Sequence, residues 1–312
     1  MLPVFTIFVP VFSLILIGWL MGRFAGFATQ HYQGIAALTF NLLVPALLFY
    51  GSFNAEWPSK IPWGLFGSYY LPQLAIFILA WCLCGWRLTG AEKSCVALGS
   101  TYSNNVLIGI PCILAVFGDE ALAPAFLIIG FHSALLFTIS GLALELGQKQ
   151  GPHWKAFLKA LFNTITTPLV ASILLGVLAK LLELELPRSM VTILEWLGDA
   201  AIPCSLLVLG IALAKYSLKG IGFRVIVMSA LKVILMPLLV WVMTWYWWRP
   251  SDYEVGAVVI LLAATPVGIN AYAFAHQHKQ AEPQVAAAVL LSTMLASITM
   301  SMWLAALLLP KT

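Results

Sequence analysis

Two hydrophobic runs, each long enough to cross a bilayer, carry Pro, Gly and Asn near their centres. The first contains S-N-N-V-L-I-G-I-P at 103–111, and the second contains T-P-V-G-I-N at 265–270. Pro and Gly weaken a helix, and Asn is costly in hydrocarbon. Backbone that leaves helical geometry at membrane depth persists only where protein or a watery cavity satisfies its polar groups. The two segments therefore predict a pair of broken membrane helices.

The composition indicates a membrane environment for these runs. Hydrophobic residues make up 62% of the 312 residues and charged residues only 9%, with a mean hydropathy of +0.97. A soluble domain carries about 25% charged residues, so this chain cannot cover a globular surface with polar groups. The sequence predicts an all-α integral membrane protein. The net charge of +4 comes from single basic residues between apolar runs, which does not indicate nucleic-acid binding.

Ten apolar segments reach the roughly 20-residue length that one membrane span requires. They lie at 3–22, 32–53, 62–86, 94–117, 121–144, 164–182, 196–214, 223–247, 255–275 and 284–309. The longest hydrophilic stretch falls at the centre of the chain. We therefore expect a first five-helix repeat over 1–146, a cytoplasmic linker over 147–160 and a second five-helix repeat over 161–312.

Pro and Gly recur at a nearly constant offset between the two halves. Three pairs are 158 residues apart and a fourth is 155 apart: Pro10 with Pro168, Gly18 with Gly176, Pro45 with Pro203, and Pro111 with Pro266. Five spans are an odd number, so a second copy would insert upside down, as an inverted repeat. The broken fourth and ninth helices then become symmetry mates that cross near the bilayer midplane.

Lys and Arg are distributed unevenly between the expected loops. Ten lie in odd-numbered loops, whereas five lie in even-numbered loops and at the termini. Because Lys and Arg are retained preferentially on the cytoplasmic side, the odd loops should be cytoplasmic and both termini should lie on the opposite side.

The residues at the two breaks are candidates for binding a substrate. They are Asn104, Asn105, Gly109, Pro111, Pro266, Gly268 and Asn270. Pro frees a carbonyl one turn back, and Gly lets backbone approach a ligand. Two crossing half-helices would aim their positive N-terminal ends at one point, which suits a carboxylate, and Asn can donate to it. Alternatively, these Asn side chains form interhelical hydrogen bonds worth about 1 kcal/mol each.

Lys232 is the only basic residue well inside an expected span. An intramembrane charge is costly and should face the protein interior or a cavity, so Lys232 could hold a substrate carboxylate or join a proton relay. It could instead snorkel to an interface. Asp199 could be its partner or an interfacial N-cap. His132 is more often hydrogen-bonded structure than a proton carrier in such a position.

Patterns for catalysis and nucleotide binding are missing from the sequence. It contains no G-x-x-x-x-G-K-[ST], no H-E-x-x-H and no G-x-S-x-G. The five cysteines lie in or beside apolar runs without a metal-ligand spacing. We therefore predict no catalytic residue, no metal site and no cofactor.

The two broken segments resemble the two crossover segments of the auxin efflux carrier family, and the likeness is to its bacterial members, which include malonate transporters. The resemblance covers essentially all ten spans. It implies a scaffold of spans one, two, six and seven, and a mobile transport unit of the other six. It also implies elevator-like exchange of small organic anions across a bacterial inner membrane, with periplasmic termini. Asn105 and Asn270 would then be the polar residues at the crossover.

The leading prediction is a secondary transporter of small mono- or dicarboxylates such as malonate. A cation/proton antiporter with the same crossed helices is the alternative, although the crossing carries Asn and no Asp or Glu. A membrane-embedded enzyme or a sensor is disfavoured by the missing catalytic patterns and output domain. The expected partners are a small carboxylate and membrane lipid, with a homodimer left open and no nucleic acid expected. The coupling ion and the direction of transport stay open.

Overall fold

The computed structural model describes residues 2–24, 29–85, 87–147, 162, 166–217 and 221–308. Within these ranges the chain is helical apart from its connections and one isolated antiparallel bridge. The expected linker at 147–160 lies outside the described residues, apart from Gly147 at the end of a helix.

The helices follow one another along the chain with short connections. The α-helices are α1 (Leu2–Phe24), α2 (Thr29–Leu38), α3 (Val44–Asn54), α4 (Trp63–Leu83), α5 (Gly90–Thr101), α6 (Ile110–Phe117), α7 (Leu122–Gly147), α9 (Pro168–Leu181), α10 (Arg188–Leu213), α11 (Phe223–Ala230), α12 (Met236–Val242), α13 (Tyr253–Ala264), α14 (Ile269–His278) and α15 (Glu282–Leu308). Between them lie a 3₁₀ turn, η3 (Asp119–Ala121), and the π-helical segments η1 (Thr39–Leu43), η2 (Asn105–Gly109), η4 (Leu231–Leu235) and η5 (Met243–Trp248).

Seven helical stretches in the described ranges are long and apolar enough to cross a membrane. They are Ile7–Phe24, His31–Asn54, Trp63–Leu83, Asp119–Glu145, Arg188–Leu213, Phe223–Trp248 and Glu282–Leu308. Three shorter apolar helices, Asn105–Phe117, Pro168–Leu181 and Tyr253–Ala264, fall in the other three expected spans. Asn105–Phe117 and Tyr253–Ala264 each adjoin a non-helical segment that interrupts the expected span, which explains why neither reaches full spanning length.

Three of the π-helical segments stand immediately before a proline. Pro45, Pro111 and Pro237 each lie at the second residue of the α-helix that follows η1, η2 and η4. Proline lacks an N–H and removes one i→i−4 hydrogen bond, and its ring crowds the carbonyl of residue i−4. At all three sites a π turn precedes the proline, and the helix continues. The helix therefore continues through Gly109 and Pro111, and the break expected at those residues lies farther back, at Tyr102–Asn104.

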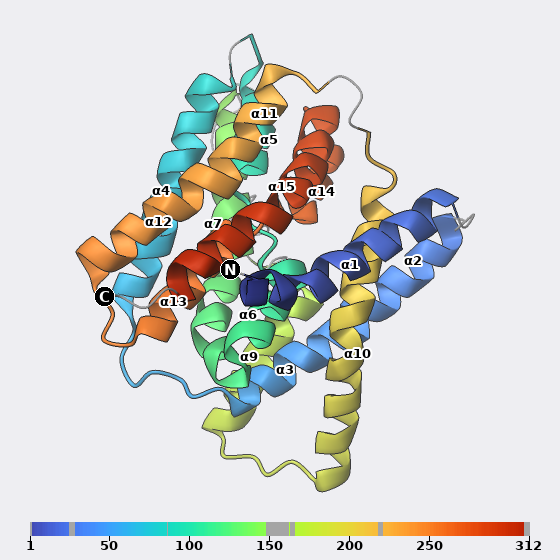
Figure 1. Ribbon diagram of the computed structural model, residues 1–312, viewed down its shortest axis with the longest axis vertical. Coiled ribbons are helices and arrows are strands. Elements are labelled where there is room, and N and C mark those ends of the chain that lie inside the picture. Colours follow the sequence, from blue (N-terminus) through green and yellow to red (C-terminus); the bar gives the residue numbers. More distant parts are fainter. Residues whose placement is uncertain are drawn as a thin grey trace.

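The helices form two groups in Figure 1. In the first helix group (α1, α2, η1, α3, α9 and α10), α1 packs along α10, and α3 packs against both α9 and α10. The second helix group holds α4 to α7 and α11 to α15. The groups meet where α1 lies against α6 and α15, and where α7 lies against α3 and α9.

Glycines permit close helix contacts inside the first helix group. A Cβ added at Gly18 would collide with the backbone of Leu207 in α10, and one at Gly176 would collide with the Phe49 carbonyl and Ser52 Oγ of α3. Both contacts involve backbone, so neither can be relieved by moving a flexible side chain. These two glycines stand at the position that the sequence repeats after 158 residues.

We expect Gly176→Leu to destabilise the purified protein, because the added side chain would force α9 away from α3. Overpacking a close contact costs about 1–3 kcal/mol. The measurement is the thermal unfolding midpoint in detergent. Gly130→Leu is the matched control, since a Cβ at Gly130 meets no atom within 4 Å. Equal midpoints for Gly176→Leu and Gly130→Leu would contradict the α3–α9 packing.

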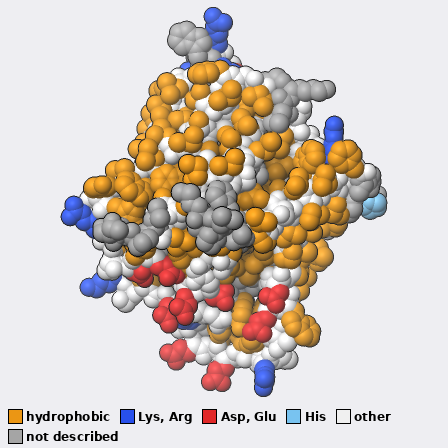
Figure 2. Space-filling model, viewed as in Figure 1, with side chains coloured by type: hydrophobic (Ala, Val, Ile, Leu, Met, Phe, Trp, Pro, Cys, Tyr) orange, Lys and Arg blue, Asp and Glu red, His pale blue; other side chains and the backbone are white. Residues whose placement is uncertain are grey.

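Acidic side chains gather at one end of the molecule in Figure 2, where α3 ends and α10 begins. The even-numbered loops of the sequence are acidic at η3, in the connection before α10 and at the start of α13. Their acidic residues are Asp119, Glu120, Glu183, Glu185, Asp252 and Glu254. This distribution agrees with placing the even-numbered loops on the side opposite the basic loops.

Candidate functional site

The non-helical segments that interrupt the two broken helices meet at the short antiparallel bridge. We call this meeting point the crossing. The Asn104 N–H donates to the Pro266 carbonyl at 2.9 Å, and the Gly268 N–H donates to the Tyr102 carbonyl at 2.9 Å. Ser103 is thereby paired with Val267. The bridge satisfies backbone groups that would otherwise be unpaired in a buried, non-helical segment. The prolines that the sequence aligns, Pro111 and Pro266, are not the residues that pair.

The second break has a local cause, and glycines allow close contacts on both sides of the crossing. Thr265 precedes Pro266 and is extended, with ψ at 150°, because the residue before a proline avoids helical geometry. Gly268 lies so close to Tyr102 that a Cβ there would stand 2.7 Å from the ring. Gly109 instead lets η2 approach α13, since a Cβ there would stand 2.8 Å from Leu262.

Side chains from two further helices accept hydrogen bonds from the remaining N–H groups of the bridge. The Ser103 N–H donates to His132 Nε2 of α7 at 3.1 Å, and the Val267 N–H donates to Ser292 Oγ of α15 at 3.0 Å. Because Nε2 accepts, a neutral His132 ring carries its proton on Nδ1. His132 therefore supports the bridge, and no pattern in the sequence marks Ser292 for the same task.

The asparagines Asn105 and Asn270 connect the crossing to neighbouring helices. Asn105 Nδ2 donates to the Tyr69 hydroxyl of α4 at 2.9 Å, and Asn105 Oδ1 accepts from Thr265 Oγ1 at 3.4 Å. Asn270 Nδ2 donates to the Tyr102 hydroxyl at 3.1 Å. Both amides therefore have protein partners, as the interhelical alternative expects. The two tyrosines belong to this network, although no pattern in the sequence marks them for this role.

A cavity of about 780 Å³ lies beside the crossing. Its walls come from both helix groups: η1 and the start of α9 on one side, and the crossing, α7 and α14 on the other. Four of the eight candidate residues line it, namely Asn104, Asn105, Gly268 and Asn270. Gly109, Pro111, Pro266 and Lys232 are not among its lining residues and serve the packing around the crossing instead.

Asn104 differs from the other two asparagines in having an unused donor. Its side chain is only 5% exposed, and its Nδ2 finds no acceptor among the described residues. A buried donor left unpaired costs about 1–3 kcal/mol. Asn104 lines the cavity, so a rotation of its side-chain amide toward the cavity would offer this hydrogen bond to a ligand.

Two helices also begin at this cavity. The Asn105–Phe117 helix starts directly after Asn104, and α14 starts directly after Gly268. The first N–H groups of a helix have no intrahelical acceptor, and that end carries a partial positive charge. The cavity therefore combines two positive helix ends with a free amide donor, an arrangement that favours an anion.

Lys232 is fully buried but does not reach the cavity lining. Its Nζ donates to the Ala263 carbonyl of α13 at 2.7 Å. Asp199, the partner that the sequence offers, is exposed on α10. The expectation that Lys232 contacts the substrate is therefore not supported, and snorkelling to an interface is not observed either.

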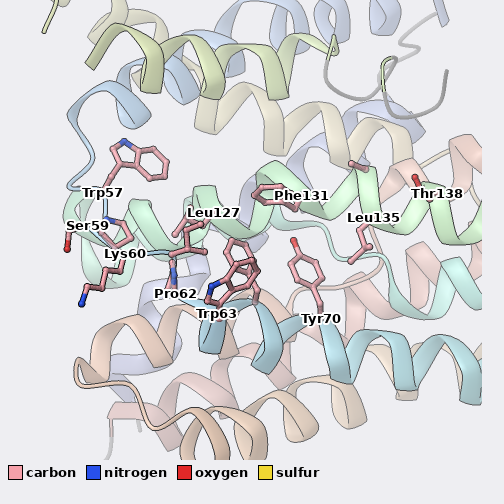
Figure 3. A pocket seen from close by; sticks show the side chains of 14 residues that line it. Trp57, Ser59, Lys60, Pro62, Trp63, Tyr70, Leu127, Phe131, Leu135 and Thr138 are labelled. Carbon is pink, nitrogen blue, oxygen red and sulfur yellow. The ribbon is translucent and has the colours of Figure 1, made fainter. Parts of the chain in front are cut away.

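A second cavity, a groove of about 650 Å³, lies between α4, α7 and the loop that follows α3 (Figure 3). Aromatic and aliphatic side chains such as Trp63 and Phe131 dominate its walls, with Lys60 at one end. Its Tyr70 hydroxyl already donates to the Ile128 carbonyl at 2.6 Å. This groove suits an apolar chain better than a small carboxylate, so the cavity at the crossing is the candidate site.

Comparison with known proteins gives concordant matches over most of the chain. A family model described as membrane transport protein matches residues 3–304. A protein of Rhizobium meliloti named "Putative malonate transporter" is 27% identical over 298 residues, which cover 94% of this chain and 92% of that protein. An uncharacterized transporter of Methanothermobacter thermautotrophicus is 22% identical over 309 residues, covering 94% and 95%.

The family match confirms the resemblance that the two crossing segments indicate. It also confirms that this is a transport protein rather than an enzyme, and its apolar helices make it a multi-pass membrane protein. Because the family model spans nearly the whole chain, this protein belongs to the membrane transport protein family, which is the auxin efflux carrier family.

Proposed function

We propose that this protein is a secondary transporter of small organic anions, specifically mono- or dicarboxylates such as malonate. The observation that carries the proposal is Asn104, a buried cavity-lining residue whose amide Nδ2 has no protein partner, at a point where two helix N-termini converge. A carboxylate would accept the free N–H and would be stabilised by both helix ends. The name of the Rhizobium relative supports a dicarboxylate, because that protein is similar over nearly its full length.

The proposed mechanism is elevator-like alternating access. The first helix group would act as the scaffold, and the second helix group would carry the crossing as a rigid transport unit. The cavity supports this division because it lies between the groups, with η1 and α9 on the scaffold side. Sliding the second helix group past these walls would move a bound anion without dismantling the bridge that recognises it.

The proposed architecture is ten spans in two inverted five-helix repeats. An inverted repeat exchanges span one with span six and span two with span seven. The contact of α1 with α10 then corresponds to the contact of α9 with α3, and Gly18 and Gly176 mediate these contacts in the two halves. This correspondence supports the repeat independently of the proline spacing.

The proposed orientation places both termini in the periplasm of a bacterial inner membrane. A reporter that is active only in the cytoplasm, fused after Thr312, should then be silent. The same reporter inserted within the Gly147–Lys159 segment should be active, which controls for expression. Strong activity of the C-terminal fusion would overturn the orientation if the linker reporter is silent, and the odd number of spans in the second repeat if both reporters are active.

The test of the proposed site is Asn104→Ala. A hydrogen bond to a charged partner contributes about 1.5–3 kcal/mol, so carboxylate affinity should fall roughly 10- to 100-fold. The unliganded protein should lose no stability, because the removed donor has no protein partner. The measurements are malonate, succinate and lactate binding by calorimetry and uptake into proteoliposomes.

Asn54→Ala is the matched control, because Asn54 is exposed at the end of α3 and does not line the cavity. It should bind and transport as the unsubstituted protein does. If Asn104→Ala leaves the affinity for every bound carboxylate unchanged, the substrate does not use this amide. If the unsubstituted protein binds none of the carboxylates, the proposed function is wrong.

A further inference from the structure

The first halves of the two broken helices, α5 and α13, end at the crossing, where the second halves begin. α5 ends at Thr101 and α13 ends at Ala264, both fully buried. The last carbonyls of a helix have no intrahelical donor, and that end carries a partial negative charge. Each buried end therefore needs a donor from elsewhere, and each would repel an anion in the neighbouring cavity.

The donor comes in both cases from the span that precedes the broken helix. Gln73 Nε2 of α4 donates to the Thr101 carbonyl at 3.0 Å, and Lys232 Nζ of η4 donates to the Ala263 carbonyl at 2.7 Å. Both side chains are buried, at 1% and 0% exposure. They stand 159 residues apart (232 − 73), within one residue of the offset that relates Gly18 to Gly176. The two halves thus cap their broken helices from matching positions, one with an amide and one with an ammonium.

Lys232 differs from Gln73 in carrying a full charge when its amine is protonated. Among the described residues, no carboxylate lies within ion-pair distance of Lys232, because the one ion pair found there joins His276 and Glu282. The helix end compensates only about half of an elementary charge. Protonated Lys232 therefore leaves a net positive charge directly behind the crossing, next to α13.

The cavity at the crossing is lined by residues that follow the interruption after α13, namely Gly268, Ile269 and Asn270. Ala263 precedes Thr265 by two residues, and Thr265 contacts Asn105, which lines the cavity. We infer that Lys232 determines charge specificity from behind the proposed site: it cancels the repulsive end of α13 and favours anions without touching them. Gln73 is its neutral counterpart, and its Nε2 also lies 3.5 Å from His132 Nδ1. This inference rests on the proposed carboxylate function.

The test separates the charge of Lys232 from its hydrogen bond. Lys232→Gln keeps an amide donor like that of Gln73 and removes the charge, whereas Lys232→Arg keeps the charge. For a charge on the order of 10 Å from the anion, at an effective dielectric constant of about 20, affinity should fall roughly tenfold per carboxylate charge. In the full-length purified protein, Lys232→Gln should therefore weaken malonate binding roughly tenfold more than lactate binding. Lys232→Arg should retain the original ratio of the two affinities.

Gln73→Ala is the control for losing a neutral cap, together with its contact to His132, without any change of charge. It should lower the thermal midpoint and leave the malonate-to-lactate affinity ratio unchanged. If Lys232→Gln is not monodisperse, Gln73→Lys carries the test, because a second charge at the matching position should tighten malonate binding relative to lactate. An unchanged ratio in a folded Lys232→Gln or Gln73→Lys variant would leave Lys232 as a structural cap and overturn the inference. The proposed function fails separately, if the unsubstituted protein binds no carboxylate.

Discussion

Gly268→Val should reduce carboxylate transport about 10- to 100-fold, because it would push apart the two bridged segments of the crossing. A Cβ at Gly268 would lie 2.7 Å from the Tyr102 ring and 3.1 Å from the Ser103 carbonyl oxygen. Tyr102 cannot easily retreat, since its ring packs 4.7 Å from His132 and 5.2 Å from Phe137, centroid to centroid. Forcing extra atoms into such a contact costs about 1–3 kcal/mol, and the shift would fall on the residues that line the cavity.

The measurement is initial uptake into proteoliposomes, with monodisperse gel filtration to establish folding. Gly130→Val is the matched control on α7, where a Cβ meets no atom within 4 Å. A second variant, Gly268→Val with Tyr102→Leu, should regain stability because it makes room for the added Cβ. Full transport by Gly268→Val alone would show that the bridge is not needed for function.

Asn105→Ala should produce the largest loss of stability among the cavity-lining asparagines. Asn105 is 2% exposed, and both ends of its amide are used, by Tyr69 and by Thr265. Removing the amide would leave the Tyr69 hydroxyl without this donor and weaken the link to α13. Because each buried group left unsatisfied costs about 1–3 kcal/mol, we expect a loss of about 2–4 kcal/mol.

The measurement is the thermal unfolding midpoint of the unliganded protein, with Asn104→Ala beside it. The two residues are neighbours of the same type in the same cavity wall. Only the Asn105 amide forms hydrogen bonds with side chains outside its own helix, those of Tyr69 and Thr265. Asn105→Ala should therefore unfold several degrees lower, whereas Asn104→Ala should not. Equal midpoints would contradict this division of roles.

Much of the architecture could be predicted from residue types alone. Long apolar runs with 9% charged residues leave a chain no alternative to membrane helices. Pro266 and Gly268 also locate the second break correctly, because proline acts on the residue just before it. The first break was misplaced at Gly109 and Pro111, because a π turn absorbs the missing hydrogen bond of Pro111.

The roles of individual polar residues were decided only by the tertiary structure. Asn104 and Asn105 are adjacent and identical in type, so no local pattern distinguishes the free amide from the bonded one. Their difference depends on Tyr69 and Thr265, which lie 36 and 160 residues from Asn105. The position of Lys232 in an apolar run likewise predicts that a buried lysine needs a partner. The sequence cannot identify that partner, because it is a backbone carbonyl, a group that every residue has. The sequence by itself determined that this chain must break two helices inside a membrane. Only packing decided which side chains satisfy those breaks and which one is left for a ligand, because hydrogen-bond partners are set by distance in space rather than by position along the chain.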